Sequence, residues 1–256
     1  MPEILYTKEM IEWYDSLYCR SENTKAQIKF LKNLFKKNKV KKIIDVPCGT
    51  GRHAIELSKI GFSITGIDKG KTMVKYAKNK AEKCGVKVKF IVQDMQKIKL
   101  KEKFDAAIIM YGSLAYLTSN ESILKCLLSI KNNLKKNGIV IIEDDNPWQD
   151  IVARRLTTVY KIKSADRKMI VRHKIKVHKE NNLMEIMSSY ERYIKNKKLQ
   201  IKADKRPIIL RIFSKNELEL ILTMAGFKNI KTFGNFSGKK FSSKNYKKII
   251  MTAFKA

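Results

Sequence analysis

The spacing of hydrophobic positions changes along the chain and predicts its organisation. Up to about residue 35, apolar side chains recur every three or four positions, which predicts one amphipathic helix over residues 10–18 and a second over residues 28–35. From residue 42 to residue 143, short apolar runs alternate with helical segments. Beyond Trp148 the spacing falls to two, and after Ser214 a helical segment and two apolar runs follow. The pattern predicts two helices, an α/β core, an extended insertion and a return to the core.

The alternating segment supplies most of the predicted core. We expect its strands at residues 42–46, 62–67, 86–92, 104–110 and 139–143. We expect its helices at residues 54–60, 71–84 and 122–134. Strands that alternate with helices favour a parallel sheet with helices on both faces. The predicted fold class is therefore α/β, with a Rossmann-like sheet.

The period of two after Trp148 predicts an antiparallel β insertion. One face of its clearest strand would carry apolar side chains and one histidine, namely Met169, Val171, His173, Ile175 and Val177. The other face would carry Arg172, Lys174, Lys176 and His178. Residues 183–194 and 208–213 also have an extended pattern, so we expect three or four strands in this insertion.

Ser214 marks the return to the core. Together with Glu217 it forms a capping box, which predicts a helix that ends near Gly226. Two last strands are expected at residues 228–233 and 248–254.

Composition limits the classes of protein to consider. The chain has 256 residues, of which 44% are apolar, enough for one α/β domain with an elaboration. It has no apolar run of about 18 residues, and its first ten residues lack an apolar signal core. Its four cysteines form no C-x-x-C pair, so neither a metal site nor a disulfide framework is predicted. We expect no membrane span and a cytoplasmic location.

Lysine dominates the charge of the chain. The formal net charge is +31, with 28 basic and 17 acidic residues in 1–150 and 27 and 7 in 151–256. A basic surface attracts anions over about 8 Å in physiological salt. The basic C-terminal part therefore leaves two interpretations open: a solvated lysine-rich surface, or a site for an anionic partner.

A glycine-rich turn lies between the first predicted strand and the next helix, with the sequence Asp45-Val46-Pro47-Cys48-Gly49-Thr50-Gly51. Glycines there allow a sharp turn and let a ligand approach more closely than a Cβ would permit. The spacing from Gly49 through Gly51 to Ala54 fits the general dinucleotide fingerprint. His53 follows the turn, and we expect it to face solvent.

Two further carboxylates sharpen this prediction. Asp68 ends the second predicted strand, where a carboxylate can bind both hydroxyls of a ribose. Asp94 ends the third, where it can accept from an adenine amino group while Met95 packs on the ring. With Asp45, three acidic strand ends would converge on one crevice at the carboxyl edge of the sheet.

Over essentially its whole length the chain resembles the class I S-adenosylmethionine-dependent methyltransferases, with Pro47 where a glycine is common. The resemblance implies that Asp45 and the Gly49–Gly51 backbone hold the methionine part of S-adenosylmethionine. It also implies that Asp68 holds the ribose, and that Asp94 and Met95 hold the adenine. The implied cofactor-binding set further includes Pro47, Cys48, Thr50, Lys69 and Tyr111, the last of these near the sulfonium.

Within this class, residues 112–117 and the late insertion are similar to the glycine N-methyltransferase and amino-sugar N-methyltransferase branch. In that branch the N-terminal helices and the insertion cover the active site, which implies that Tyr14 and Arg20 reach the cofactor. The chain would then comprise N-terminal helices and a cofactor-binding core (1–155), an antiparallel insertion covering the substrate (156–213), and a last helix with two core strands (214–256).

Methyl transfer from a sulfonium is an in-line displacement, so the enzyme must chiefly place the nucleophile about 3 Å from the methyl carbon; orientation of this kind contributes roughly 7–11 kcal/mol. A base is needed only if the nucleophile arrives protonated, and the candidates are Tyr111, His173 and Asp144. For Tyr111 and His173 the competing interpretation is packing in the core. No metal is expected.

The expected reaction is methyl transfer to nitrogen or oxygen of a small molecule, and an anionic acceptor would agree with the charge of the chain. A tRNA or rRNA substrate is the alternative favoured by the basic C-terminal part, although aromatic residues are not interleaved with the lysines as a stacking platform. An NAD-dependent oxidoreductase or a non-catalytic cofactor-binding protein would use the same crevice. The sequence predicts no oligomeric state.

Overall fold

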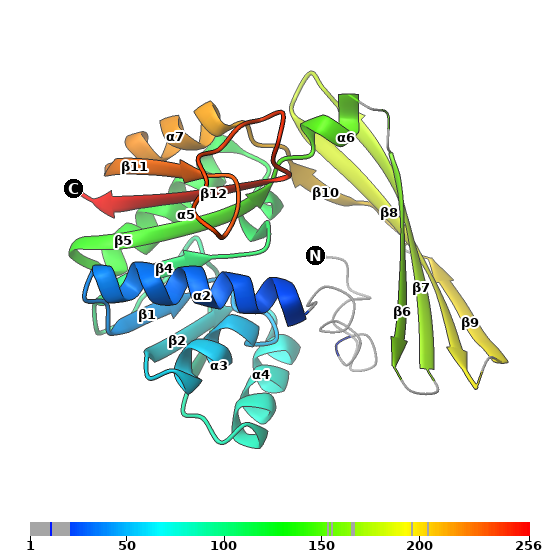
Figure 1. The fold of residues 1–256 in the computed structure, drawn as a ribbon, viewed down its shortest axis with the longest axis horizontal. Helices are drawn as coiled ribbons and strands as arrows, with labels where there is room; N and C mark the ends of the chain where they lie inside the picture. Colours follow the sequence, from blue (N-terminus) through cyan, green and yellow to red (C-terminus); the bar gives the residue numbers. More distant parts are fainter. Residues whose placement is uncertain are drawn as a thin grey trace.

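The computed structural model describes residues 11, 21–152, 154, 156–164, 167–195, 197–203 and 205–256. In this part of the chain, a seven-stranded sheet with helices forms the core, and a five-stranded sheet stands beside it (Figure 1). The first predicted helix lies outside the described residues except for Ile11, which is buried. None of the described helices is long and apolar enough to cross a membrane.

The core sheet has the strand order β11-β12-β5-β4-β1-β2-β3. Its strands are β1 (Lys42–Asp45), β2 (Ser63–Asp68), β3 (Lys89–Val92), β4 (Phe104–Ile109), β5 (Leu134–Asp145), β11 (Phe227–Phe233) and β12 (Lys248–Lys255). Strands β1 to β5 pair in parallel, whereas β12 is antiparallel to both of its neighbours. The chain order reverses between β1 and β4, and in open α/β sheets ligands bind at the carboxyl ends of the strands beside such a reversal.

Helices cover both faces of this sheet, which confirms the predicted fold class. The described helices are α2 (Ser21–Lys37), α3 (Arg52–Lys59), α4 (Lys71–Lys83), the 3₁₀ helix η2 (Ser113–Tyr116), α5 (Asn120–Asn133), α6 (Trp148–Val152) and α7 (Lys215–Met224), of which α6 lies beside the second sheet. One apolar cluster joins one face to α2, α3 and α4, and another joins the opposite face to α5 and α7. Neighbouring residues of a strand point to opposite faces, so Ile43 belongs to one cluster and Ile44 to the other.

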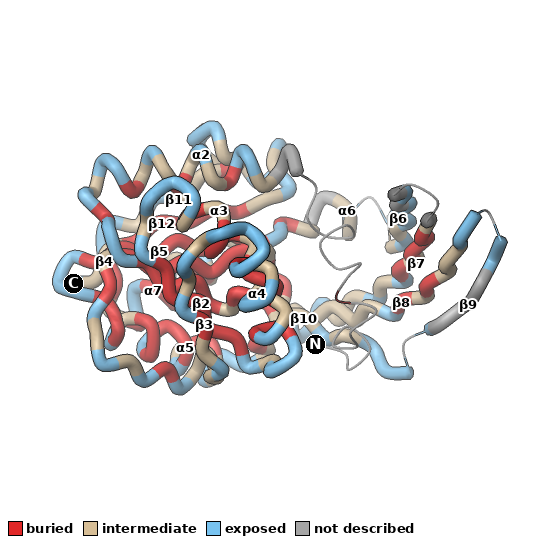
Figure 2. The backbone as a smooth tube through the Cα atoms, turned by 90° about the horizontal axis from the view of Figure 1, so that it is seen from below, coloured by how far each residue is buried: buried red, intermediate tan, exposed pale blue. Residues whose placement is uncertain are grey.

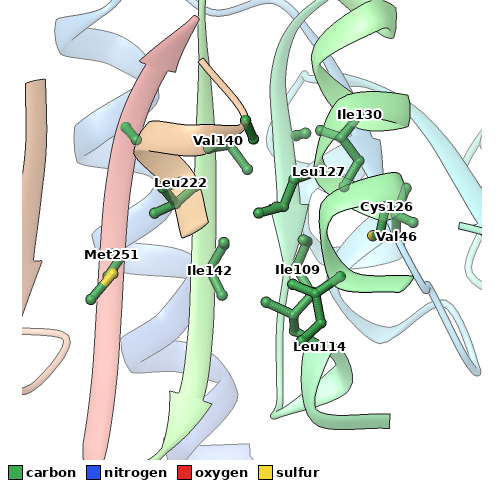
Figure 3. Packing of buried hydrophobic residues seen from close by; sticks show 14 of the residues in the cluster. Val46, Ile109, Leu114, Cys126, Leu127, Ile130, Val140, Ile142, Leu222 and Met251 are labelled. Atoms are coloured by element: carbon green, nitrogen blue, oxygen red, sulfur yellow. The ribbon is translucent and has the colours of Figure 1, made fainter. Parts of the chain in front are cut away.

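Figure 3 shows the cluster on the α5 and α7 face, where Leu127 and Ile130 of α5 pack toward Val140 and Ile142 of β5. Strands buried on both faces have continuous apolar sequences, and this is why the core strands could be located from the sequence. Figure 2 shows that buried positions are concentrated in the core sheet and its helices.

The second sheet is antiparallel throughout. Its strands are β6 (Thr157–Ser164), β7 (Arg167–His178), β8 (Leu183–Ile194), β9 (Lys197–Ala203) and β10 (Ile208–Arg211), in the order β10-β8-β7-β6 with β9 also paired to β8. The expectation of three or four strands was therefore too low. Strands β6 and β9 were missed because they are edge strands in which lysines interrupt the apolar residues, so the sequence has only a weak apolar alternation there.

An arginine ties the second sheet to the core. Arg211, at the end of β10, donates to the Glu217 carboxylate of α7 at 2.6 Å and to the Thr118 carbonyl after η2 at 3.0 Å. Both side chains of this ion pair are largely buried. The contact fixes β10 against the segment that follows β4, which is one boundary of the crevice described below.

Ser214 caps helix α7 as predicted, because its Oγ accepts a hydrogen bond from the Glu217 N–H at 3.1 Å. We expect Ser214→Ala to lower the free energy of unfolding by about 0.5–2 kcal/mol, since the first turn loses its acceptor. Chemical denaturation measures this change. Ser214→Asp, which keeps a capping oxygen, is the control, and equal stability of the alanine variant would contradict the assignment.

Candidate functional site

The glycine-rich turn is held between the two strands that flank β1. The Val46 N–H donates to the Ile108 carbonyl of β4 at 2.9 Å, and the Cys48 N–H donates to the Ile67 carbonyl of β2 at 2.8 Å. The Cys48 side chain is buried in the apolar cluster under α3. The turn therefore leaves the sheet at the carboxyl ends of β1, β2 and β4, where the chain order reverses.

The two glycines of the turn serve different purposes. Both have positive φ, +52° at Gly49 and +75° at Gly51. A Cβ on Gly51 would lie 2.9 Å from the Phe90 ring and 3.0 Å from the Ala77 Cβ, whereas a Cβ on Gly49 would have nothing within 4 Å. The expectation of close ligand approach thus applies to Gly49, while Gly51 is required by packing inside the protein. Thr50, between them, is buried.

Asp68, at the end of β2, holds the turn in place. Its buried carboxylate accepts from the Gly49 N–H at 2.9 Å and from the Gly70 N–H at 2.7 Å. Burial raises the pKa of this carboxyl, and the two backbone hydrogen bonds oppose the rise. Each carboxylate oxygen has a second lone pair, so binding to the backbone leaves acceptor capacity for a ligand.

An open pocket lies beside Asp68. Asp94 and Met95, after β3, line this pocket together with Pro47 and Lys69. Its other lining residues are Ile67, Gln93, Gln96, Ser113, Tyr116 and Leu117. The pocket thus unites predicted residues from three strand ends with the segment after β4.

Asp45, at the end of β1, is almost completely buried. Within the described part of the chain, its Oδ2 has no hydrogen-bond partner. Burial raises the pKa of this carboxyl to about 7, although the nearby Arg52 guanidinium opposes the rise. A buried carboxylate oxygen without a donor is costly unless a ligand supplies one.

Tyr111 follows β4 in a left-handed conformation, with φ of +65°, which is uncommon for a residue other than glycine. Its N–H donates to Glu143 Oε2 at 3.0 Å. The Arg52 guanidinium carbon lies 4.9 Å and the Lys248 Nζ 5.3 Å from the centre of its ring. These contacts fix the residue at the carboxyl edge of the sheet, beside the glycine turn.

Glu143 is the centre of a buried polar network that sequence reasoning missed. Besides Tyr111, it accepts from Gln27 Nε2 at 2.9 Å and pairs with Lys248 Nζ at 3.1 Å. Gln27 Oε1 in turn lies 3.0 Å from His53 Nε2. The network connects α2, α3, β5 and β12, and no local sequence pattern could have indicated contacts between segments so far apart.

His53 is buried, so the expectation that it faces solvent was wrong. Helix α2 packs against α3 and supplies Gln27 as its partner. Burial lowers the pKa of His53 well below its usual range, which keeps the imidazole neutral.

The remaining candidates lie in different places. His173 is buried in the second sheet, where its Nδ1 lies 2.8 Å from Ser188 Oγ, as in the competing interpretation of a satisfied core histidine. Asp144 is buried at the end of β5. Tyr14 and Arg20 lie outside the described residues. Among the described residues, no group of histidine, cysteine or acidic side chains could hold a metal ion.

Comparison with known proteins bears on this geometry. Residues 37–222 match a family model described as a methyltransferase domain. The chain is 27% identical over 143 residues to a glycine/sarcosine N-methyltransferase of Aphanothece halophytica, covering 55% of this chain and 54% of that protein. It is 24% identical over 147 residues to a dTDP-3-amino-3,4,6-trideoxy-alpha-D-glucopyranose N,N-dimethyltransferase of Streptomyces venezuelae, covering 56% of this chain and 59% of that one. The chain thus spans little more than half the length of these relatives.

Similarity of fold to solved structures covers more of the chain than the sequence matches do. An S-adenosylmethionine-dependent methyltransferase from Clostridium acetobutylicum superposes with a TM-score of 0.81 over 97% of this chain and 98% of the other, at 18% identity. Both the core sheet and the second sheet therefore lie within the matched region.

Proposed function

The chain belongs to the methyltransferase-domain family, and from that premise we propose that it transfers the methyl group of S-adenosylmethionine to a nitrogen or oxygen atom of a small-molecule acceptor. The observation that carries the proposal is the set of acidic residues at three neighbouring strand ends. Asp45 and Asp68 end β1 and β2, and Asp94 follows β3, around a turn whose first glycine faces open space. Two of these carboxylates line the pocket, and the third has a buried oxygen without a partner among the described residues.

The residues present fit S-adenosylmethionine. Asp45 would receive the ammonium of the methionine part, because a cation satisfies its unpartnered oxygen. Gly49 leaves room for the methionine chain beside the turn. Asp68 would accept from the ribose hydroxyls, and Asp94 with Met95 would bind the adenine in the pocket. When bound, this cofactor supplies a methyl group on a positively charged sulfur, which is already activated for displacement.

The protein must then orient the methyl donor and the acceptor relative to each other. The Tyr111 backbone N–H donates to Glu143 and the ring is flanked by Arg52 and Lys248, so the ring would form one side of the space beside the transferred methyl group. Orientation of the two reactants can contribute roughly 7–11 kcal/mol. Tyr14 and Arg20 stay predicted cofactor ligands. His173 is a weaker candidate because Ser188 already satisfies its Nδ1.

The second sheet would cover the acceptor. In Figure 1 the second sheet lies past the end of the core sheet at which β5 finishes. Arg211 connects the second sheet to the segment after η2. Two relatives whose names state amine acceptors, the glycine/sarcosine and the amino-sugar enzymes, support a small molecule over nucleic acid.

The affinity for S-adenosylmethionine is expected to rise with pH through about 7. Asp45 must be ionised to pair with the ligand ammonium, and burial raises its pKa to about 7. Binding at pH 6 should therefore be about tenfold weaker than at pH 8. Calorimetry between pH 5.5 and 8.5 measures the slope, and Asp45→Asn should bind weakly at every pH with no such slope. A wild-type affinity independent of pH would contradict the role of Asp45.

The raised pKa of Asp45 also makes the stability of the ligand-free protein depend on pH, in the direction opposite to that of ligand affinity. Between about pH 4 and 7, the folded chain without ligand keeps a proton on Asp45 that the unfolded chain has lost. The contribution of this group to stability therefore falls as the pH rises through that window, and binding of the cofactor reverses the trend.

The proposed function is tested by calorimetry with S-adenosylmethionine and with NAD, followed by mass spectrometry of reactions with glycine, sarcosine, glucosamine and a matched set of alcohols. Binding of S-adenosylmethionine but not NAD, with a mass gain of one methyl group on an acceptor, is the expected result. Tight binding of bulk tRNA with a steep salt dependence would favour the nucleic-acid alternative. Failure to bind S-adenosylmethionine would overturn the proposal.

A further inference from the structure

The end of β5 carries a buried carboxyl group that the proposed cofactor contacts do not use. Asp144 is 3% exposed. Its Oδ1 accepts only from the N–H of its neighbour Asp145, at 2.8 Å, among the hydrogen bonds of the described residues. Its Oδ2 has no hydrogen-bond partner in the same part of the chain. A buried carboxyl oxygen without a donor is costly, and an N–H donor on a ligand would remove that cost.

The carboxyl lies beside the turn that connects Tyr111 to the pocket. A Cβ placed on Gly112 would lie 3.7 Å from Asp144 Oδ1, and the Gly112 N–H donates to the Glu143 carbonyl at 3.0 Å. The next residue, Ser113, lines the pocket. Asp144 therefore lies beside Gly112, the residue that precedes the pocket-lining Ser113, and its carboxyl is buried there.

The charges around Asp144 favour a positively charged ligand. Its own strand adds Glu143 and Asp145, and the neighbouring strand β12 adds Lys248. The Lys248 ammonium pairs with Glu143 at 3.1 Å and with Asp145 at 2.7 Å, and no ion pair to Asp144 is found within the described residues. Glu143 and Asp145 share this one ammonium, and Asp144, whose side chain leaves the strand on the opposite face, adds a third carboxyl to the same strand end, although the chain as a whole has a net charge of +31. A phosphorylated group would be repelled here, whereas an ammonium would be attracted.

We propose that Asp144 is a catalytic residue that binds the amino group of the acceptor and accepts its proton. The proposal rests on the proposed function, because the methyl group comes from S-adenosylmethionine. The carboxylate takes one proton from the acceptor ammonium, which leaves a neutral amine. The nitrogen lone pair then forms the bond to the methyl carbon while the carbon–sulfur bond breaks, and that electron pair stays on sulfur. Asp144 finally returns its proton to solvent.

The environment suits a proton acceptor. Burial, with a smaller contribution from the Asp145 carboxylate, holds the pKa of the Asp144 carboxyl well above its usual range, while Lys248 opposes the rise. A carboxylate with a raised pKa is a stronger base than one in water, and it gains an ion pair when an ammonium arrives.

The first test compares ligands that differ only in a basic amine. The protein is loaded with S-adenosylhomocysteine, and calorimetry measures its affinity for two matched pairs: glucosamine with N-acetylglucosamine, and glycinamide with N-acetylglycinamide. The wild-type protein is expected to bind at least one amine about tenfold or more tightly than its acetylated form. Binding of neither amine, or equal binding of both members of each pair, would overturn the proposal.

Two isosteric variants test whether the Asp144 carboxylate causes the preference for the amine. Asp144→Asn should lose the preference for the amine and keep its affinity for S-adenosylhomocysteine within about twofold, since it lies outside the proposed cofactor contacts. Asp145→Asn is the matched control because its carboxylate is mostly exposed and paired with Lys248, and it should keep the preference. A preference retained in Asp144→Asn, or lost equally in both variants, would contradict the assignment.

A pH profile separates catalysis from structural support. With the best amine from the acceptor panel, kcat/KM of the wild-type protein should fall on the acid side as Asp144 becomes protonated. Asp144→Asn should lose that limb and at least about tenfold in kcat. An unchanged profile would overturn the catalytic role. If the wild-type protein failed to bind S-adenosylhomocysteine, the proposed function itself would fail, which is a distinct outcome.

Discussion

Gly51→Ala is expected to lower the free energy of unfolding by about 2–5 kcal/mol. The new Cβ would lie 2.9 Å from the Phe90 ring and 3.0 Å from the Ala77 Cβ, in a left-handed backbone conformation. Overpacking of a core costs about 1–3 kcal/mol, and the left-handed region costs a residue with a Cβ about 1–2 kcal/mol more. Urea denaturation at constant pH measures the sum.

Gly49→Ala is the matched control, since it also has a positive φ but meets nothing within 4 Å. It should cost only about 1–2 kcal/mol of stability. Its main effect should be weaker binding of S-adenosylmethionine, because the Cβ would occupy space left for the ligand. If both variants lost the same stability, the packing role assigned to Gly51 would be wrong.

Asp68→Ala is expected to weaken binding of S-adenosylmethionine by about 1–3 kcal/mol, or roughly 5- to 150-fold. Two effects combine in this loss. The direct hydrogen bonds to the ribose disappear, and the N–H groups of Gly49 and Gly70 lose their acceptor, so the turn is no longer held in position. Calorimetry measures the affinity, and thermal denaturation the accompanying loss of stability.

The two effects can be separated with a ligand that lacks a ribose hydroxyl. The wild-type protein should bind S-adenosylhomocysteine more tightly than its 2′-deoxy form, and Asp68→Ala should bind both about equally weakly. Unchanged affinity of the variant would refute the ribose assignment. A variant that still discriminates between the two ligands would leave Asp68 only its role in holding the turn.

The core of the fold could be predicted because its strands are buried on both faces. Residues 42–46 and 104–110 are short apolar runs bounded by polar residues, and such runs have few other structural solutions. The capping residue Ser214 was also identifiable, since a helix N-cap depends on local sequence. The edge strands β6 and β9 could not be predicted from the sequence, because an edge strand has no strong apolar alternation.

The candidate site was predictable to the extent that it consists of strand ends. Asp68 and Asp94 end neighbouring parallel strands, and the topology alone brings them to one edge. The environment of each residue was not predictable. That His53 is buried against Gln27, and that Glu143 anchors Tyr111, depends on how α2 and β12 pack, which is a property of the tertiary fold.

The position of β12 has a consequence for the order in which the protein assembles during synthesis. This strand is made after β5 and β11 yet lies between them. Domains begin to fold while the chain emerges from the ribosome, N-terminal part first. Until β12 emerges, β5 and β11 each present an unpaired edge, and such edges promote association with other chains. Because Lys248 is the first residue of β12, the ion pair that neutralises Glu143 forms in the same late step as the closure of the sheet.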